Sequence, residues 1–204
     1  MGAVSYDLVP VPRGAVEFPL ALPVPPGFVA DDPASWPHVE EGQLEYFDGK
    51  LLYMPPSADR RQDTTADVLT VLGLWRRAHR DFVVAGNEAG MILGGEARGA
   101  DAAIWRRSAL GRHEGKFRRV APVLAVEVMG ELEDESALRA KAAWYLRNGV
   151  ELVWLVLPEA RKVIVLTSAG ESVLTAGQRV APHPSLPGLE PDVDDFFTQL
   201  EDLG

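Results

Sequence analysis

The chain has 204 residues, 47% of them hydrophobic, which suits one well-packed domain with a tail. Its formal net charge of −10 argues against a general nucleic-acid coating protein, because affinity for phosphates comes mostly from clustered lysine and arginine. Cysteine is absent, which excludes disulfides, thiolate nucleophiles and cysteine-based metal sites. No apolar run approaches the roughly 18 residues that cross a bilayer, so we expect a soluble cytoplasmic protein without a membrane segment.

The N-terminal segment is rich in proline. Residues 1–37 hold eight of the sixteen prolines, a density that prevents a regular helix or a central strand. We therefore expect an extended arm over residues 1–37, followed by a single α/β domain over residues 38–204. The arm packs either across this domain or across a second subunit, and the second arrangement would suit a symmetric homodimer.

A hairpin and a helix are expected next. Asp48-Gly49 separates two short runs of aromatic and aliphatic residues in `LEYFDGKLLYM`, which is the strongest local signal for a β-hairpin. After `PPSADRRQD`, four apolar residues recur at helical spacing: Val68, Leu69, Leu72 and Trp75. This pattern predicts an amphipathic helix that Asp63 or Thr64 can cap.

Several strands follow this helix. Two short ones are expected at `DFVVAG` and `MILGG`, and a third at `ADAAIWR`, where Asp101, Ala103 and Trp105 share one face. The run `PVLAVEVMG` is typical of a central strand, yet it carries one charged residue, Glu127. A lone ionised carboxylate is costly in an apolar interior, so Glu127 must be protonated, paired or bound to a metal.

The second half of the chain predicts a strand, a helix and a strand. The segment `DESALRAKAAWYLRNG` reads as a helix that Asp134 or Ser136 caps and Gly149 ends, with Lys141 at the margin of its buried stripe. The apolar run `ELVWLVLP` then indicates a strand parallel to the one that carries Glu127. An antiparallel hairpin and a short terminal helix docked by its phenylalanines complete the expected fold.

A basic loop lies between the two acid-bearing strands. The segment `RRSALGRHEGKFRR` holds six of the twenty lysines and arginines and only one acid. These six side chains are Arg106, Arg107, Arg112, Lys116, Arg118 and Arg119. Such a loop is either an anchor for a phosphate backbone or a solvated connection, and charge alone does not decide between these readings.

The acids suggest metal chemistry. If Asp101 and Glu127 converge from adjacent strands, they offer an oxygen-rich site for Mg²⁺ or Mn²⁺. A nearby Lys141 ammonium would then orient a water or stabilise developing charge. Taken singly, each residue also has a structural reading: Asp101 as a strand-end cap, Glu127 as the partner of an arginine, and Lys141 as a solvated helix residue.

The order of these motifs resembles a known family. `LEYFDGKLLYMPPS`, `ADAAIW`, `LAVEVMG`, `KAAWYLRNGVELVWLV` and `LPGLEPDVDDFF` are similar to segments of the Uma-type restriction endonucleases of the PD-(D/E)XK nuclease superfamily. The resemblance covers roughly residues 35–199 and implies a restriction-endonuclease-like mixed sheet flanked by helices. It also implies metal-dependent hydrolysis of phosphodiester bonds.

The resemblance also assigns roles to particular residues. Asp101 and Glu127 match the two metal-binding acids, Lys141 matches a lysine on the following helix, and Glu45 matches a further acid near the site. Arg60 stands where a histidine is often found, and we expect it to join the basic loop in binding nucleic acid. The sequence departs from the family pattern at Ala100, which replaces a proline, and at `MGELEDES`, which replaces Ser-Pro-Ser. Met129 occupies the usual place of the superfamily's lysine.

These observations support three hypotheses. The leading one is an endonuclease that uses Mg²⁺ or Mn²⁺ to cleave nucleic acid, with DNA as the expected substrate. In it, Asp101 and Glu127 hold the metal, Lys141 positions water, and Glu45 assists as an outer ligand or base. The second is a catalytically degenerate relative that binds nucleic acid or a protein through the same surface. The third is a metal-dependent hydrolase of a small phosphate ester.

Overall fold

The computed structural model describes residues 18–112, 115 and 117–200. Its strands are β1 (Leu20–Leu22), β2 (Gln43–Phe47), β3 (Lys50–Met54), β4 (Phe82–Leu93), β5 (Glu96–Arg106), β6 (Leu124–Val128), β7 (Leu152–Leu157), β8 (Lys162–Thr167) and β9 (Gly170–Thr175). Its helices are α1 (Asp59–Ala78) and α2 (Glu135–Arg147). Four short 3₁₀ turns add η1 (Pro33–Ser35), η2 (Arg107–Ala109), η3 (Val193–Phe196) and η4 (Thr198–Leu200).

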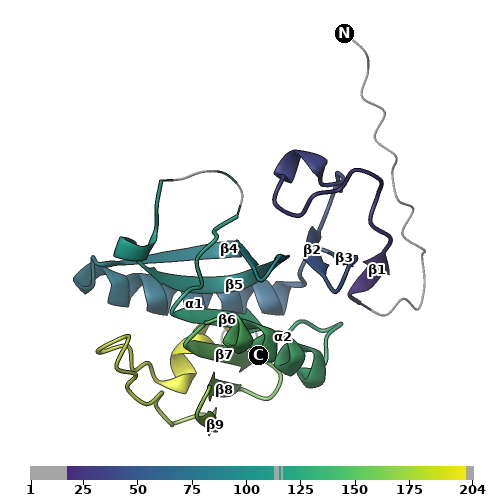
Figure 1. Ribbon diagram of the computed structural model, residues 1–204. Coiled ribbons are helices and arrows are strands. Elements are labelled where there is room, and N and C mark those ends of the chain that lie inside the picture. Colours follow the sequence, from purple (N-terminus) through teal and green to yellow (C-terminus); the bar gives the residue numbers. More distant parts are fainter. Residues whose placement is uncertain (1–17, 113–114, 116, 201–204) are drawn as a thin grey trace.

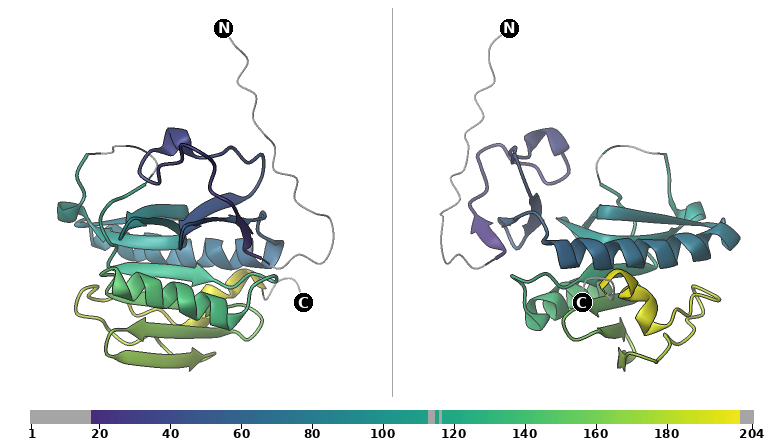
Figure 2. Two further views of the ribbon diagram at one scale, coloured as in Figure 1. Left: turned by 45° about the vertical axis from the view of Figure 1, so that its right-hand side comes forward. Right: turned by 180° about the vertical axis from the view of Figure 1, so that it is seen from behind.

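The strands form one mixed sheet with helices on both faces. Its order is β1-β3-β2-β5-β6-β7-β8-β9, and β4 also pairs with β5 (Figure 1). One face carries α1 together with η3 and η4, and the opposite face carries α2 (Figure 2). The expected mixed α/β sheet flanked by helices, with an N-terminal hairpin, is therefore confirmed.

The hairpin forms where the sequence predicts it. Asp48 and Gly49 have φ angles of 48° and 71°, as a tight loop of two positive-φ residues requires. β1 pairs with the outer edge of β3, so the described part of the proline-rich segment joins the sheet only at its edge. This position agrees with the expectation that its prolines exclude it from the centre of the sheet. Residues 1–17 lie outside the described residues.

The start of α1 differs from the expectation. The helix begins at Asp59 after Ala58, which makes no side-chain cap, so the cap expected at Asp63 or Thr64 was wrong. The reason lies in the first turn, where Arg61 is buried and its Nη2 lies 3.0 Å from Asp101 Oδ1. This tertiary contact extends the helix by a turn beyond its apolar stripe.

The two short strands expected before the basic loop join into one. β4 runs antiparallel to β5 along its whole length, with a register shift between Gly86 and Ala89. Because Gly86 pairs with Ala102 and Ala89 with Ala100, the irregularity lies directly opposite Asp101. Bulges of this kind redirect side chains and are common beside active sites.

The unit from β6 to β7 agrees with the sequence reading. The two strands pair in parallel, with Glu127 opposite Leu155. The Asp134 carboxylate accepts a hydrogen bond from the Ala137 backbone N–H at 2.8 Å and so caps α2. Gly149 follows the helix with φ 91°, a left-handed conformation that glycine adopts readily.

Two hydrophobic clusters hold the layers together. One lies beneath α1 and includes Leu72, Trp154 and the buried rings of Phe196 and Phe197. The other lies beneath α2 and includes Tyr145. The C-terminal segment docks through its phenylalanines as expected, but as 3₁₀ turns. Within the described residues, no helix is both long and apolar enough to span a membrane.

Two leucines of α1 provide a matched test of this packing. Leu72 is fully buried, whereas 58% of Leu74 is exposed. We expect Leu72→Ala to lower the free energy of unfolding by about 2–5 kcal/mol, because it leaves a cavity in the core. Leu74→Ala should change it by less than about 0.5 kcal/mol. Urea unfolding measures both, and equal losses would contradict the described packing.

Candidate active site

The candidate site occupies a gap in the sheet. β4 takes one edge of β5, while β2 and β6 share the other edge. On this shared edge β2 pairs with Ala97, and β6 pairs with residues 102–104. No strand of the described chain pairs with the intervening residues 98–101 on that edge. Their backbone groups therefore need side-chain partners, since unpaired buried polar groups are costly.

Charged side chains fill this need at Gly99. Its N–H donates to Glu45 Oε1 at 3.0 Å, and its carbonyl oxygen accepts from Lys141 Nζ at 2.7 Å. The hydroxyl oxygen of Tyr145 lies 3.1 Å from the same carbonyl. β2 and α2 thus meet at one glycine of β5.

Glu127 is enclosed by side chains of α2. Only 2% of its surface is exposed. Its Oε2 lies 3.0 Å from Lys141 Nζ, and its Oε1 accepts a hydrogen bond from the Tyr145 hydroxyl at 2.6 Å. The buried charge is therefore paired with an ammonium, where the sequence reading had considered an arginine.

Lys141 also binds the second buried glutamate. Its Nζ lies 2.9 Å from Glu45 Oε1, so the ammonium has three oxygen partners within 3.0 Å. The other oxygen of Glu45 accepts from Arg98 Nε at 2.9 Å. The guanidinium of Arg98 in turn lies over the ring of Phe47, 4.7 Å from its centroid. The cluster thus alternates positive and negative groups from β2, β5, β6 and α2.

Asp101 is held by a different set of groups. Arg61 Nη2 lies 3.0 and 3.2 Å from its two oxygens, and the Val128 N–H donates to Oδ2 at 2.7 Å. Arg61 Nη1 also lies 3.3 Å from Glu133 Oε2. Asp101 therefore accepts a hydrogen bond from the backbone of β6, as expected if it caps a backbone N–H at a strand end. The buried Arg61 balances its charge.

The electrostatics separate the two glutamates. Burial raises the pKa of Glu127 from its ordinary value of 4.5 to about 7; Lys141 opposes this shift, and the charges of Asp101 and Glu45 add to it. Burial acts in the same direction on Glu45, but Lys141 and Arg98 outweigh it and lower the pKa of Glu45 to about 2. Burial tends to lower the pKa of Lys141, yet the two glutamates raise it, so the amine is a stable cation.

The structure brings all four expected catalytic residues into this region. Glu45, Glu127 and Lys141 are in one contact network, and Asp101 is linked to β6 beside Glu127. Sequence reasoning missed the roles of Tyr145, Arg98 and Arg61. Tyr145 was detectable, because it lies four residues after Lys141 on the same helix face.

Arg60 and Arg61 differ in orientation. Arg60 is exposed and forms an ion pair with Glu159, outside the acid cluster. Its neighbour Arg61 is 7% exposed and contacts Asp101 instead. The two adjacent arginines could not be told apart by sequence, because the expected helix start left both of them in a loop.

Asp101 and Glu127 are the residues whose chemistry would suit a divalent cation. The described residues contain no group of three or more His, Cys, Asp and Glu side chains that could hold a metal. Burial raises the pKa of Glu127, and the charge of Asp101 adds to this shift, so the two carboxylates interact electrostatically. Mg²⁺ is often held by only one or two carboxylates, with water and substrate phosphates as its remaining ligands. This donor pair therefore fits a hard cation.

The basic loop runs beside β4. The backbone of Arg118 exchanges hydrogen bonds with Gly90 and Ile92 of that strand. A groove of about 660 Å³ lies between the loop and β4, and four arginines line it: Arg107, Arg112, Arg118 and Arg119. Gly86 and Ala89, the residues on either side of the β4 irregularity, also line it. The groove thus passes over the part of β4 that lies opposite Asp101.

The loop's arginines have varied partners. Arg106 lies outside the groove and pairs with Glu151 at 2.6 Å, and Arg119 pairs with Asp31 of the N-terminal segment. The guanidinium of Arg118 lies 4.3 Å from the centroid of the Trp105 ring. Lys116 lies outside the described residues.

The fold is shared with a solved structure. It is similar to a crystal structure described as a "putative nuclease belonging to DUF820" from Anabaena variabilis ATCC 29413. The TM-score is 0.74 at 19% sequence identity, and the match covers 85% of this chain and 99% of that one. At this identity the likeness shows the fold, a restriction-endonuclease-like mixed sheet.

The sequence itself identifies the family. Residues 31–195 match the model of the Uma2 family, which is described as "Putative restriction endonuclease". The chain belongs to this family, which confirms the resemblance noted from its motifs. No curated protein matches the chain.

Replacement by glutamine is expected to have opposite effects on stability at the two buried glutamates, Glu127 and Glu45. A raised pKa means that Glu127 stabilises the fold below its ordinary pKa of 4.5 and loses this contribution as the pH rises through about 7. In metal-free protein above that pH, we expect Glu127→Gln to raise the melting temperature by roughly 2–6 °C. The gain should shrink as the pH is lowered.

Glu45→Gln provides the contrast. The lowered pKa of Glu45 means that its carboxylate stabilises the fold above pH 4.5 and loses this contribution as the pH falls toward about 2. We expect this variant to be less stable by about 3 kcal/mol at neutral pH, because Lys141 and Arg98 lose a buried partner. Thermal unfolding in EDTA measures the melting temperatures of both variants. If both substitutions destabilise the protein to a similar extent, the pKa values of Glu127 and Glu45 are not shifted in opposite directions.

Proposed function

We propose that this protein is a divalent-metal-dependent nuclease that hydrolyses phosphodiester bonds, with DNA as its expected substrate. The observation that carries the proposal is the pair of buried acids, Asp101 and Glu127, beside the Lys141 ammonium at a gap in the sheet. The family assignment and the fold support the nuclease class. The choice of metal and of DNA is our inference from the chemistry of the site.

Asp101 and Glu127 would hold Mg²⁺ or Mn²⁺. The bound cation would supply charge neutralisation, polarisation of the phosphate and a lower pKa for a coordinated water. Cation binding at Glu127 would be favourable, because burial and the neighbouring acids make its ionised form costly without a counter-charge. Arg61 would have to release at least one Asp101 oxygen, and Glu133 is already in place as an alternative partner.

Lys141 contributes a fixed positive charge. Its pKa is raised by Glu127 and Glu45, although burial opposes this effect, so the side chain donates hydrogen bonds and does not accept a proton at neutral pH. Close to the metal-binding acids, this ammonium can orient the attacking water or stabilise the charge that develops on the phosphate oxygens. It thereby fills the role of the superfamily lysine, whose usual position is occupied by Met129.

Glu45 and Tyr145 act as positioning residues. A carboxylate with a pKa of about 2 is a weak base, so we assign Glu45 to holding Lys141 and Arg98 and not to proton abstraction. Tyr145 donates its hydroxyl proton to Glu127 and fixes the orientation of that carboxylate. The direction in which Glu127 presents its oxygens therefore depends on α2.

The basic loop would bind the substrate backbone. The groove lined by Arg107, Arg112 and Arg118 passes over β4 opposite Asp101, and clustered arginines are the usual phosphate contacts. Such contacts position nucleic acid without reading its sequence. A homodimer, and the division into an arm over residues 1–37 and one domain over residues 38–204, stay predictions.

A second candidate is a catalytically degenerate nucleic-acid-binding relative. One observation favours it: Asp101 is bound by Arg61 through both oxygens, and Glu127 by Lys141, so each acid already has a cationic partner. Such a protein would bind oligonucleotides equally well with Mg²⁺ or with EDTA and would cleave none of them. A hydrolase of small phosphate esters would instead need metal and ignore polynucleotides.

The nuclease proposal predicts metal-dependent cleavage that the acids control. Wild type should nick supercoiled plasmid or cut labelled single-stranded DNA with Mg²⁺ or Mn²⁺, and EDTA should stop it. Asp101→Asn and Glu127→Gln should each lose at least about 100-fold in rate, because each removes a metal ligand. Lys141→Ala should lose a comparable factor through lost charge stabilisation.

A distant arginine provides the control. Arg179 is exposed and pairs with Asp192 in the C-terminal segment, so Arg179→Ala should cleave like wild type. Circular dichroism and melting curves establish that each variant is folded. Cleavage that persists in folded Glu127→Gln would overturn the assignment of the metal site.

The arginine groove makes a separate prediction about salt. Arg112→Ala should weaken oligonucleotide binding and reduce the slope of log affinity against log salt by about one, because one phosphate contact is lost. Fluorescence anisotropy across a salt series measures this slope, with Arg179→Ala as the matched arginine control. An unchanged slope in Arg112→Ala would remove this residue from the phosphate path.

A further inference from the structure

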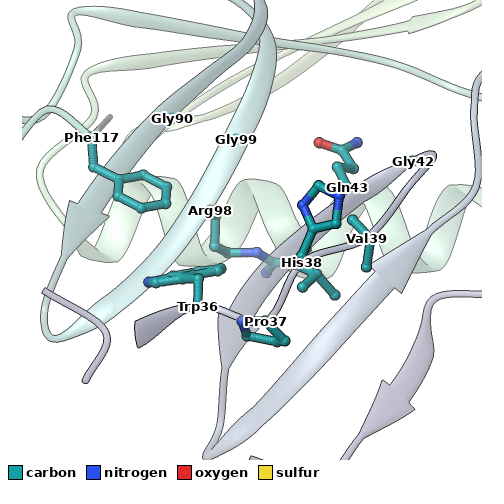
Figure 3. A pocket seen from close by; sticks show the side chains of 11 residues that line it. Trp36, Pro37, His38, Val39, Gly42, Gln43, Gly90, Arg98, Gly99 and Phe117 are labelled. Carbon is teal, nitrogen blue, oxygen red and sulfur yellow. The ribbon is translucent and has the colours of Figure 1, made fainter. Parts of the chain in front are cut away.

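A small pocket lies next to the acid cluster and is not used by the proposed mechanism. Figure 3 shows the side chains that line it. Its volume is about 260 Å³. Side chains of the segment before β2, together with Arg98 of β5 and Phe117 of the basic loop, surround it. Gly42, Gly90 and Gly99 also line it.

The pocket has an aromatic wall and a polar rim. The rings of Trp36 and Phe117 contact each other with centroids 5.1 Å apart, and the Trp36 N–H donates to the Ala30 carbonyl oxygen at 3.1 Å. His38 and Gln43 also line the pocket and bring polar side chains to it (Figure 3). Aromatic rings beside hydrogen-bonding groups suit a planar heteroaromatic ring, such as a nucleobase.

The pocket is joined directly to the candidate active site. Gly99 lines the pocket, while its carbonyl oxygen accepts from Lys141 and its N–H donates to Glu45. Arg98 lines the pocket as well and pairs with Glu45. The pocket therefore shares Gly99, whose carbonyl oxygen holds Lys141, with the candidate active site.

The pocket also adjoins the arginine groove. Gly90 and Phe117 line both cavities, so the two form neighbouring parts of one surface. A nucleic-acid strand with phosphates in the groove could extend a base toward Trp36. Basic grooves beside aromatic platforms are the usual way in which proteins bind single strands.

We propose that this pocket, lined by Trp36, His38, Gln43, Arg98 and Phe117, binds an unpaired nucleobase of the substrate and so directs the protein to single-stranded nucleic acid. The inference rests on the proposed function for the presence of nucleic acid at this surface. A base in a duplex is stacked on both faces and exposes only its edges, so it must leave the stack to enter such a pocket. Duplex substrates are therefore disfavoured.

The test separates contacts to bases from contacts to phosphates. Full-length wild type in EDTA, where no cleavage occurs, is titrated by fluorescence anisotropy with labelled oligothymidylate. Parallel titrations use an abasic oligonucleotide of the same length, a duplex of the same length, and oligouridylate, which distinguishes RNA from DNA. We expect oligothymidylate to bind about tenfold more tightly than the abasic strand and the duplex, because the abasic strand lacks the stacking base.

Two Trp36 variants assign this preference to the pocket. Trp36→Leu keeps an apolar side chain but removes the aromatic face, so it should lower affinity for oligothymidylate about tenfold and leave affinity for the abasic strand unchanged. Trp36→Phe should retain most of the preference. A merely structural role for Trp36 would instead weaken binding to both strands equally.

Three outcomes would overturn the pocket proposal: equal affinity for the abasic strand and oligothymidylate, tighter binding of the duplex, or no binding of any strand. Because binding is measured without metal, the result is independent of cleavage. A base preference without any metal-dependent cleavage would support the pocket and refute the nuclease. Metal-dependent cleavage without a base preference would refute the pocket alone.

Discussion

The rest of the site depends on the unpaired edge of β5 between β2 and β6. Main-chain groups at Gly99 have no strand partner there, so they bond to Glu45 and Lys141, and the Val128 N–H bonds to Asp101. Side chains that satisfy backbone groups in this way are held in fixed positions. A break in the hydrogen-bond ladder therefore concentrates the charged residues of four elements at one place.

This arrangement accumulates charge in the interior of the sheet. Glu45, Asp101 and Glu127 are all at least 91% buried, and they are interleaved with Arg61, Arg98 and Lys141. Buried ion pairs seldom improve stability over well-packed apolar residues, because desolvation offsets their attraction. The proposed nuclease function would give these ion pairs a role that stability does not, since phosphoryl transfer needs a preorganised set of charges.

Much of the fold was predictable from local patterns. The Asp48-Gly49 turn and the apolar strands around α2 each reflect interactions between near neighbours in sequence. The start of α1 was not predictable, because Arg61 is drawn into the helix by Asp101, forty residues later. The joining of two short strands into β4 likewise depends on its pairing with β5, and not on its own residues.

The candidate site was predictable in part. Glu127 and Lys141 were suggested by a charge in an apolar strand and by a cation at the margin of a buried helix stripe. Their contact depends on how α2 packs on the sheet, which periodicity does not encode. The ion pair between Arg98 and Glu45 forms at the gap that β2 and β6 leave on one edge of β5. No local sequence pattern indicates such a gap.

The central claim is that Asp101 and Glu127 together hold one divalent cation. Titration of the full-length protein with Mn²⁺, followed by electron paramagnetic resonance of the free ion, tests it without any substrate. The account predicts saturable binding of one Mn²⁺ by wild type and its loss in both Asp101→Asn and Glu127→Gln. Absence of saturable binding by wild type, or binding that survives in both variants, would contradict it.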